Sequence, residues 1–296
     1  MSTLLPRFTE WYTIDGTEFA NHGFWINAIT KSHAGKKGND IDVPSIHGVA
    51  WREKRFTSRT ETWNITITDA NATTGVVAAT EAGRRSEFNA NYDTVMAILT
   101  STNQLTIAHS RINIASSGTV DIRYGYGEIT SSFNMDDHKT LTYCEFTVDV
   151  VFADPRWYDY ANYSPSLVGT ISTASLTASI SNSAAVIGTA PVTYMTITFA
   201  ATTQNLVNPR LTNQTYSSTS VIGYTGTVTA GTSIVINTEA LTVKTGTATN
   251  VISGLYRSGT RQDWMVLFPI TNTLVFSQNS TAGRGTCTID YKRAYI

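Results

Sequence analysis

The chain has 296 residues, a formal net charge of -1, and only 15% charged residues. This length suits two domains better than one, and near neutrality disfavours nucleic acid as the main ligand. No window reaches the roughly 18 consecutive apolar residues of a membrane span, and the opening residues lack the basic and apolar regions of a secretory signal. We therefore expect a protein that is made and folded in a cytosol.

The first half contains runs in which apolar and polar residues alternate, which is the period of a half-buried strand. Residues 63–69 show this alternation, with Trp63, Ile65 and Ile67 on one face. Residues 119–126 repeat it, and one face there carries Val120, Ile122, Tyr124 and Tyr126. The clearest strand spans 143–152, and its predicted core face carries Cys144, Phe146, Val148, Val150 and Phe152.

Two segments of the first half depart from this alternation. Residues 31–48 are rich in Gly and Lys and poor in apolar residues until Ile41, which indicates either a long mobile loop or an extended hairpin. In residues 86–100 the apolar side chains fall at helical spacing, and Ser86 is placed to cap the first turn. We expect one amphipathic helix there, packed on the sheet.

After Tyr160 charges become sparse, and short strand-like runs follow one another with Gly, Asn and Thr-Gly turns between them. Strands are predicted in 192–199, 232–237, 240–244, 263–269, 272–276 and 285–296. This spacing is typical of a β-sandwich. In the first of these strands, Met195, Ile197 and Phe199 are predicted to face inward. Cys144 and Cys287 lie in strand-like runs of different halves, so we interpret both as buried free thiols.

The stretch "VVFADPRWYDY", Val150 to Tyr160, marks the predicted domain boundary. Pro155 lacks an N–H group and biases Asp154 away from helix, so the preceding strand should end there. We therefore predict domains 1–156 and 157–296, with Asp154, Pro155, Trp157 and Tyr158 as the junction. The aromatic residues are expected to pack the start of the second domain against the first.

The spacing of the His, Cys, Ser and Gly residues matches no motif for catalysis, metal binding or dinucleotide binding. None of the five histidines pairs with another His or Cys at a metal-ligand spacing: His22, His33, His47, His109 and His138. We interpret each of them as a loop or surface residue. There is no Gly-x-Ser-x-Gly elbow, and the glycines at 125 and 127 indicate a turn or bulge in a strand rather than a dinucleotide fingerprint. We predict no catalytic, cofactor-binding or metal-ligating residues, and a binding or assembly role without enzyme activity.

Several segments in order resemble the distal tail protein family of long, non-contractile-tailed bacteriophages, the siphovirus-type tail component. They are "YTIDGTEF" (Tyr12 to Phe19), the run from Asp40 to Thr68, "ADPRWYD" (Ala153 to Asp159), and much of the second half. In the run from Asp40, matching places are held by Val43, Pro44, Gly48, Arg52 and Arg59. The chain departs from the family by having "PSIHG" where many members have a Pro-Gly-Arg-Asp-Gly-like turn.

The resemblance implies a mainly β protein whose first half is a tail-tube-like β-barrel or sandwich with one packed helix, followed by a galectin-like C-terminal β-sandwich. It implies a structural virion protein that forms a hexameric ring at the tail tip. The expected partners are other copies of the chain, the major tail tube protein, the baseplate hub or tail-associated lysin, and a receptor-binding or tail fibre protein. No cofactor, specific nucleic acid or membrane insertion is implied, and assembly would take place in the host cytoplasm.

Interface and ligand hypotheses follow from these expectations. We expect the loop with His33, Lys36, Lys37, Asn39 and Asp40 to contact a neighbouring subunit or the tube. The alternative function is a carbohydrate-binding, lectin-like tail adhesin that recognises host cell-surface saccharide through exposed aromatic residues: Tyr216, Tyr224, Tyr256 and Trp264. A third hypothesis, a depolymerase, would need paired acids in a cleft.

Overall fold

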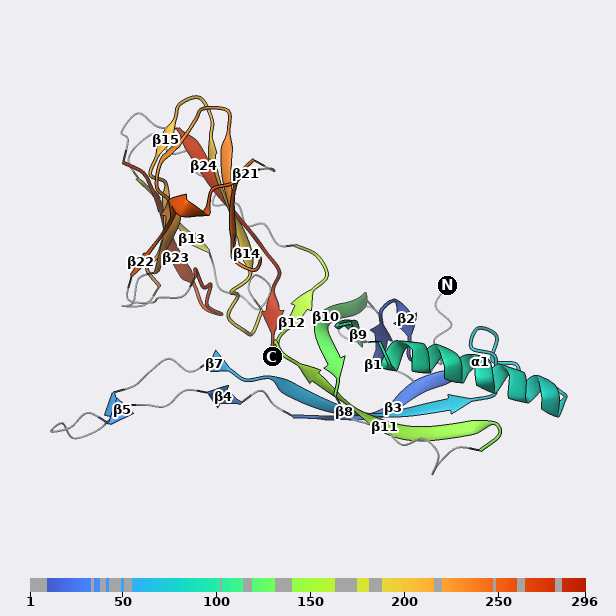
Figure 1. Cartoon of the computed structure of the whole chain (residues 1–296). Helices are drawn as coiled ribbons and strands as arrows, with labels where there is room; N and C mark the ends of the chain where they lie inside the picture. Colours follow the sequence, from blue (N-terminus) through green and yellow to red (C-terminus); the bar gives the residue numbers. More distant parts are fainter. Residues whose placement is uncertain are drawn as a thin grey trace. The chain divides into compact units, whose positions relative to one another are not determined.

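The computed structural model describes most of the chain (Figure 1). The described residues are 10–32, 35–37, 41–42, 49–50, 55–101, 103–113, 119–130, 140–162, 175–180, 188–215, 220–246, 249–259, 264–279 and 284–296. Contacts divide the chain into two compact units, Met1–Trp157 and Tyr158–Ile296. The roles assigned to domains 1–156 and 157–296 stay predictions, and each unit is described by itself.

The first unit is built on one antiparallel sheet with the order β2-β1-β9-β10-β11-β8-β3. Its strands are β1 (Glu10–Ile14), β2 (Thr17–Glu18), β3 (Phe24–Lys31), β8 (Arg59–Thr68), β9 (Leu105–Asn113), β10 (Thr119–Ile129) and β11 (Tyr143–Phe152). The longest ladder joins β8 to β11, from Tyr143 opposite Thr68 to Phe152 opposite Arg59. The mainly β character with a packed helix is confirmed.

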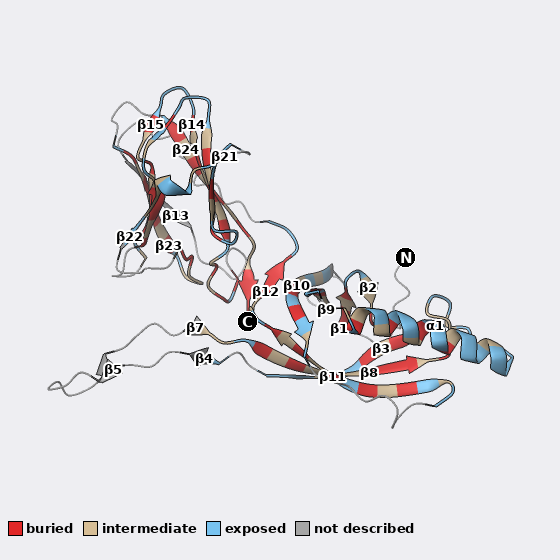
Figure 2. Cartoon of the chain, viewed as in Figure 1, coloured by how far each residue is buried: buried red, intermediate tan, exposed pale blue. Residues whose placement is uncertain are grey.

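The core face of this sheet follows the predicted alternation in β8 and β11, where buried residues recur at every second position (Figure 2). On β8 the side chains of Trp63, Ile65 and Ile67 are fully buried. On β11 the predicted core residues are at most 4% exposed: Cys144, Phe146, Val148, Val150 and Phe152. These two strands bury their apolar sides because each fits a pleated surface with one dry face.

The predicted core face of β10 is wrong. Val120, Ile122 and Tyr126 are 45%, 42% and 40% exposed, and only Tyr124 on that face is buried. The opposite face carries Gly127, where a Cβ would lie 2.8 Å from the Ile107 and Val150 side chains. Gly125 and Gly127 are thus regular strand residues whose missing side chains make room for the core, not a turn or bulge.

The helix α1 (Glu81–Leu99) begins earlier than predicted. Its N-cap is Thr80, whose hydroxyl accepts a hydrogen bond from the Gly83 N–H at 3.1 Å, so the prediction of Ser86 as the cap is wrong. Its buried residues are Phe88, Asn91, Val95 and Leu99. Among the residues that the structure describes, no helix has the length and apolar character required to cross a membrane.

Asn91 fixes α1 against the sheet edge. Its side-chain amide donates to the carbonyl oxygens of Thr68 at 2.9 Å and Ala70 at 2.8 Å. This close approach requires a glycine on the facing strand segment, because a Cβ at Gly23 would lie 2.5 Å from the Asn91 amide nitrogen. A polar residue on the buried helix face is thereby satisfied.

Beyond β3 and β8 the chain continues as a two-stranded ribbon. β4 (Lys36–Lys37) pairs with β7 (Arg55–Phe56), and β5 (Ile41–Asp42) pairs with β6 (Val49–Ala50). Of the two structures predicted for this segment, its described residues form the extended hairpin. Lys36 and Lys37 of the predicted interface loop lie in β4, whereas His33, Asn39 and Asp40 lie outside the described residues.

The second unit contains two five-stranded antiparallel sheets, β13-β23-β16-β17-β22 and β21-β20-β19-β14-β24. The first consists of β13 (Ser175–Ile180), β16 (Arg210–Asn213), β17 (Ser220–Tyr224), β22 (Leu255–Gly259) and β23 (Asn272–Ser277). The second consists of β14 (Met195–Ala201), β19 (Ser233–Asn237), β20 (Thr242–Thr245), β21 (Thr249–Asn250) and β24 (Gly285–Tyr291). Shorter elements are β15 (Leu206–Val207), β18 (Thr227–Val228), η3 (Ile252–Gly254) and β25 (Ala294–Tyr295), and β12 (Trp157–Asp159) joins the units.

These two sheets pack face to face as a sandwich. Phe199 of β14 and Phe276 of β23 come from different sheets, and their ring centroids lie 5.7 Å apart. The predicted inward residues of β14 are confirmed, since Met195, Ile197 and Phe199 are at most 3% exposed. Cys287 on β24 is free and fully buried, as is Cys144 in the first unit, and burial raises the pKa of the Cys287 thiol.

The strand predicted in 263–269 is wrong, because its described residues, 264–269, form only an isolated bridge between Leu267 and Val192. The buried side chain of Asn272 holds this segment instead. Its oxygen accepts from the Phe268 N–H at 3.0 Å, and its amide donates to the carbonyl oxygens of Phe268 and Ile270 at 2.9 and 2.7 Å. Asn213 adds to the network by donating to the Asn272 oxygen at 3.1 Å and to the Val266 carbonyl at 2.8 Å.

We expect Asn272→Ala to lower the unfolding free energy of the second unit by roughly 2–4 kcal/mol, because several buried partners lose their hydrogen bonds. Native-state hydrogen exchange of the β16 and β23 amides measures this change in the intact chain. Asn279→Ala, at an exposed position just after β23, is the matched control. Equal protection in both variants would contradict the assigned role.

Candidate functional site

The residues predicted at the junction are held by two arginines. The Arg156 side chain donates to both carboxylate oxygens of Asp154, at 2.7 and 2.8 Å. The buried Arg59 on β8 donates through Nη1 to the Pro155 carbonyl oxygen at 2.7 Å. β11 has already ended at Phe152, so these contacts replace a sheet ladder where the chain leaves the first unit.

Arg59 and Glu61 form a buried ion pair on the core face of β8. They are 6% and 0% exposed, and Arg59 Nε lies 3.4 Å from Glu61 Oε1. The Arg59 guanidinium lies over the rings of Phe152 and Trp157, at 4.2 and 4.6 Å from their centroids. Trp63 Nε1 donates to the second oxygen of Glu61 at 3.0 Å. Burial lowers the pKa of Arg59, and the Glu61 carboxylate opposes that shift.

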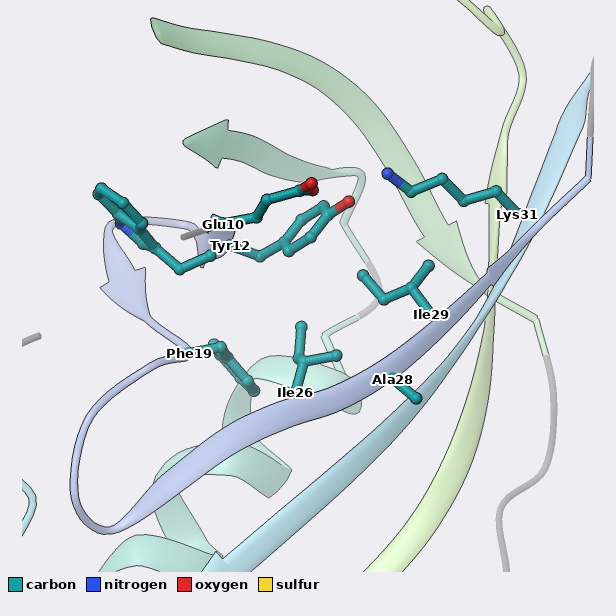
Figure 3. A pocket seen from close by; sticks show the side chains of 8 residues that line it. Glu10, Tyr12, Phe19, Ile26, Ala28, Ile29 and Lys31 are labelled. Carbon is teal, nitrogen blue, oxygen red and sulfur yellow. The ribbon is translucent and has the colours of Figure 1, made fainter. Parts of the chain in front are cut away.

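An aromatic stack lies beside the ion pair. The rings of Tyr12 and His109 are stacked at 4.7 Å with an interplanar angle of 9°. Tyr12 also packs on Trp63 at 5.3 Å, and His109 packs on Trp157 at 5.7 Å. Figure 3 shows the Tyr12 ring pointing from β1 toward β3. Its buried hydroxyl has no hydrogen-bond partner among the described residues, and burial raises its pKa.

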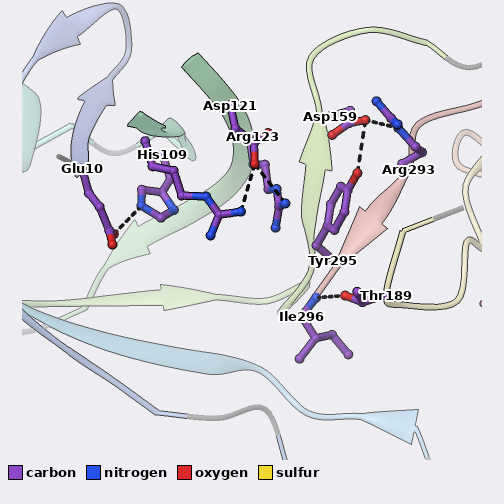
Figure 4. Close-up of polar contacts among 10 residues, drawn as sticks. Glu10, His109, Asp121, Arg123, Asp159, Thr189, Arg293, Tyr295 and Ile296 are labelled. Atoms are coloured by element: carbon purple, nitrogen blue, oxygen red, sulfur yellow. Dashed lines mark hydrogen bonds and ion pairs between the residues drawn. The ribbon is translucent and has the colours of Figure 1, made fainter. Parts of the chain in front are cut away.

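Charged residues continue around the stack on β1, β9 and β10 (Figure 4). His109 Nε2 lies 2.9 Å from a Glu10 carboxylate oxygen, and Asp121 accepts from Arg111 at 3.1 Å and from Arg123 at 3.0 Å. Burial lowers the pKa of His109, and the hydrogen bond with Glu10 only partly opposes this. Burial works to raise the pKa of Glu10, but His109 and nearby cations outweigh it and lower that pKa.

The charged groups of this cluster pair with one another and hold the strands together, an arrangement typical of a structural role. The carboxylates of Glu10, Glu61 and Asp121 each contact a cation or an N–H donor within the unit. In the part of the chain that the structure describes, no group of three or more His, Cys, Asp and Glu residues is arranged to hold a metal ion. The cluster ties β1, β8, β9 and the exit of β11 together around two buried charges.

Sequence reasoning named Asp154, Pro155 and Trp157 as junction residues, which stays a prediction, and it missed most of the residues that they contact. His109 was interpreted as a loop or surface residue, whereas it lies in β9 with a 13% exposed side chain. A usable signal was present in β8, where Arg59 and Glu61 continue the alternation of Trp63, Ile65 and Ile67. Charged residues at core-facing positions indicate a buried and compensated pair.

Tyr158, the last of the four predicted junction residues, belongs to the second unit. Tyr158 packs on Tyr194 with centroids 6.2 Å apart. The buried Asp159 pairs with Arg293 and lies 3.5 Å from the Tyr295 hydroxyl, and the Ile296 N–H donates to Thr189 (Figure 4). These contacts anchor the last residues of the chain to its entry into the second unit.

Of the aromatic residues considered for saccharide stacking, two lie against arginines. The Arg210 guanidinium lies 3.8 Å from the centroid of Tyr256, and that of Arg257 lies 5.3 Å from Trp264. Gly223 pairs with Arg210 on one neighbouring strand and with Tyr256 on the other. A Cβ at Gly223 would lie 2.7 Å from Arg210 Cδ, so the glycine makes room for the arginine side chain. Tyr216 lies outside the described residues.

We expect Trp157→Ala to destabilise the first unit by about 3–5 kcal/mol, because it removes a buried ring from Phe152, His109 and Arg59. Urea unfolding followed by tryptophan fluorescence reports mainly on this unit, since five of the six tryptophans fall in residues 1–157. Tyr160→Ala removes an aromatic ring that is 81% exposed and serves as control. A midpoint unchanged by Trp157→Ala would sink this assignment.

The lowered pKa of His109 makes the stability of the first unit depend on pH. At pH values below about 6.5, the ordinary pKa of histidine, His109 is protonated in the unfolded chain but resists protonation in the folded unit. The unfolding free energy therefore falls as the pH drops below about 6.5, and His109 does not change it at higher pH. We expect His109→Gln to reduce the loss of unfolding free energy between about pH 7.5 and 5.5. Urea unfolding at both pH values, with His22→Gln as control, tests this; equal losses in wild type and His109→Gln would refute it.

Comparison with known proteins gives a match in structure but not in sequence. No protein-family model matches the chain, and no curated protein matches it. The Dit protein of phage SPP1, described as a paradigm of the hub adsorption apparatus in phages that infect Gram-positive bacteria, is similar with a TM-score of 0.62. Its identity is 13%, and the match covers 98% of this chain and 100% of that chain.

Two chains from the baseplate of phage P2 in its activated conformation are also similar. The chain solved with Ca has a TM-score of 0.48 and 9% identity, covering 97% of this chain and 98% of that chain. The chain solved with Sr has a TM-score of 0.44 and 9% identity, covering 98% and 100%. From the match to the SPP1 protein, the chain has the fold of a phage distal tail protein over nearly its whole length.

Proposed function

We propose that the protein is a structural component of a phage virion, the distal tail protein that forms a hexameric ring at the tail tip. The observation that carries this proposal is the shared fold with SPP1 Dit, which covers almost the entire chain. A fold alone does not fix a function, but the first unit adds support, because its charged cluster fixes strands rather than forming a reactive site. The role proposed is therefore structural and not enzymatic.

A ring of identical subunits requires two different and complementary patches on each subunit. The ribbon that extends β3 and β8 is our candidate for one of them. Residues 32–58, which lie between β3 and β8, contain five Lys and Arg and three Asp and Glu, a net charge of +2, so the other residues sum to -3. A basic ribbon beside an acidic remainder favours contact with a second copy, through the segment containing His33, Lys36, Lys37, Asn39 and Asp40.

The further partners proposed are the tail tube protein on one side of the ring and the baseplate hub or tail-associated lysin on the other, with a receptor-binding or tail fibre protein on the second unit. The proposed location is the tail tip of the virion. The near-neutral chain suits a ring through which DNA passes, because phosphate contacts would otherwise retain it. The lectin-like alternative has weaker support, since the Arg210 guanidinium occupies one face of Tyr256.

We expect the purified protein, alone or mixed with tail tube or hub protein, to form a sixfold ring visible in projection by electron microscopy, with a mass six times that of the 32.3 kDa chain. The double substitution Lys36→Glu and Lys37→Glu should reduce assembly, because it reverses charge on β4. Lys244→Glu, at an exposed position of β20, is the matched control. A monomer under all these conditions would count against the ring, whereas assembly unaffected by the β4 variant would remove only the ribbon from the interface.

A further inference from the structure

A pocket of about 230 Å³ opens between β1 and β3 in the first unit (Figure 3). Its lining residues come from both strands and from the turn that connects β2 to β3, and they include Glu10, Tyr12, Phe19, Ile26, Ile29 and Lys31. The volume lies below the roughly 300–1,000 Å³ of sites for drug-sized ligands. It suits one aliphatic side chain with the short backbone that carries it.

The pocket lies where the two ends of the sheet face each other without pairing. β3 ends the sheet on one side, and β2 covers only Thr13 and Ile14 of β1 on the other. The two edges connect through Phe19, whose N–H donates to the Tyr12 carbonyl at 2.8 Å and whose carbonyl accepts from the Ile26 N–H at 3.3 Å. Beyond this point, within the described residues, no backbone hydrogen bond joins β1 to β3. Free edges of this kind are templates for another strand.

A β-bulge directs the side chains of β3 into this pocket. The register with β8 shifts between Ile26 and Ala28, so that Ile29 stands opposite the buried Trp63 and Lys31 opposite the buried Glu61. Asn27, the extra residue, accepts from Trp25 Nε1 and donates to Thr66 Oγ1, which fixes the bulge. Bulges commonly re-aim side chains beside functional sites.

The Tyr12 hydroxyl supplies a second and independent observation. Tyr12 is 3% exposed and its hydroxyl has no hydrogen-bond partner among the described residues. Figure 3 shows this hydroxyl on the side of the pocket nearest Lys31 and Ile29. A buried polar group without a partner calls for one that is absent from the isolated chain, and the carbonyl oxygen of an added strand would accept its hydrogen bond.

We propose that this pocket receives an extended segment of a partner polypeptide, added as a strand between the edges of β1 and β3. The aliphatic side chain of the segment would lie on Phe19, Ile26 and Ile29, and its backbone would pair with the free edge of β3. Glu10 and Lys31 carry opposite charges at the pocket, which favours a segment without net charge. The proposal stands independently of the ring.

Labelled heptapeptides test the proposal on the full chain. The probe is an acetylated, amidated peptide in which threonine and valine alternate around a central leucine, with glycine and lysine versions at the centre. Fluorescence anisotropy should show that the leucine peptide binds saturably, with a dissociation constant of about 1 mM or less. The glycine and lysine peptides should bind more weakly. Hydrogen exchange should show new protection at Ile29 and Lys31, whose N–H groups point away from β8, when the leucine peptide is bound.

Three controls separate strand addition from other binding. The same leucine peptide with N-methylated backbone amides should lose about tenfold or more in affinity, because it cannot pair as a strand. Ile29→Arg should weaken binding by about tenfold or more, whereas Thr30→Arg, on the opposite face of the same strand, should not. Tyr12→Phe should weaken it by a smaller factor. Absence of saturable binding, equal binding of the N-methylated peptide, or insensitivity to Ile29→Arg would each overturn the proposal.

Discussion

The buried ion pair of Arg59 and Glu61 is the constraint on which the first unit depends. Two charges removed from water are costly unless neighbouring groups compensate them. The Pro155 carbonyl, the indole N–H of Trp63 and the faces of Phe152 and Trp157 provide part of that compensation, whereas Arg59 Nε and Nη2 and Glu61 Oε1 have no hydrogen-bond partner among the described residues. The start of β8 and the exit of the chain from the unit are therefore held by the same guanidinium, although 96 residues separate Arg59 from Pro155.

The alternation of apolar and polar residues predicted the core correctly in strands whose buried positions carry apolar side chains. It identified the buried faces of β8, β11 and β14, because a dry face favours apolar residues at every second position. It failed for β10, where glycines face the core and carry no side chain that could signal burial. It also placed the start of α1 too late, because the capping threonine is followed by a glycine in the first turn.

The candidate site was harder to predict than the fold, for a physical reason. Its contacts join residues far apart in sequence, as in the pair of Glu10 and His109, which are 99 positions apart. Spacing motifs detect groups that a single turn or helix brings together, whereas a curled sheet brings together residues from several strands. The pocket between β1 and β3 depends in addition on a bulge at Asn27, which shows in the sequence only as an interruption of the alternation.

That bulge also precedes a register that continues into the ribbon beyond β3. The pairs Lys36 with Phe56 and Lys37 with Arg55 keep the register that β3 and β8 adopt after Asn27. Because Asn27 is the extra residue, its deletion would leave Ala28, Ile29 and Lys31 opposite the same residues of β8 and would remove only the local bend of the strand. One asparagine, tied to Thr66 and Trp25, thus adds a bend to β3 while β3 with β8 and β4 with β7 stay in one common register.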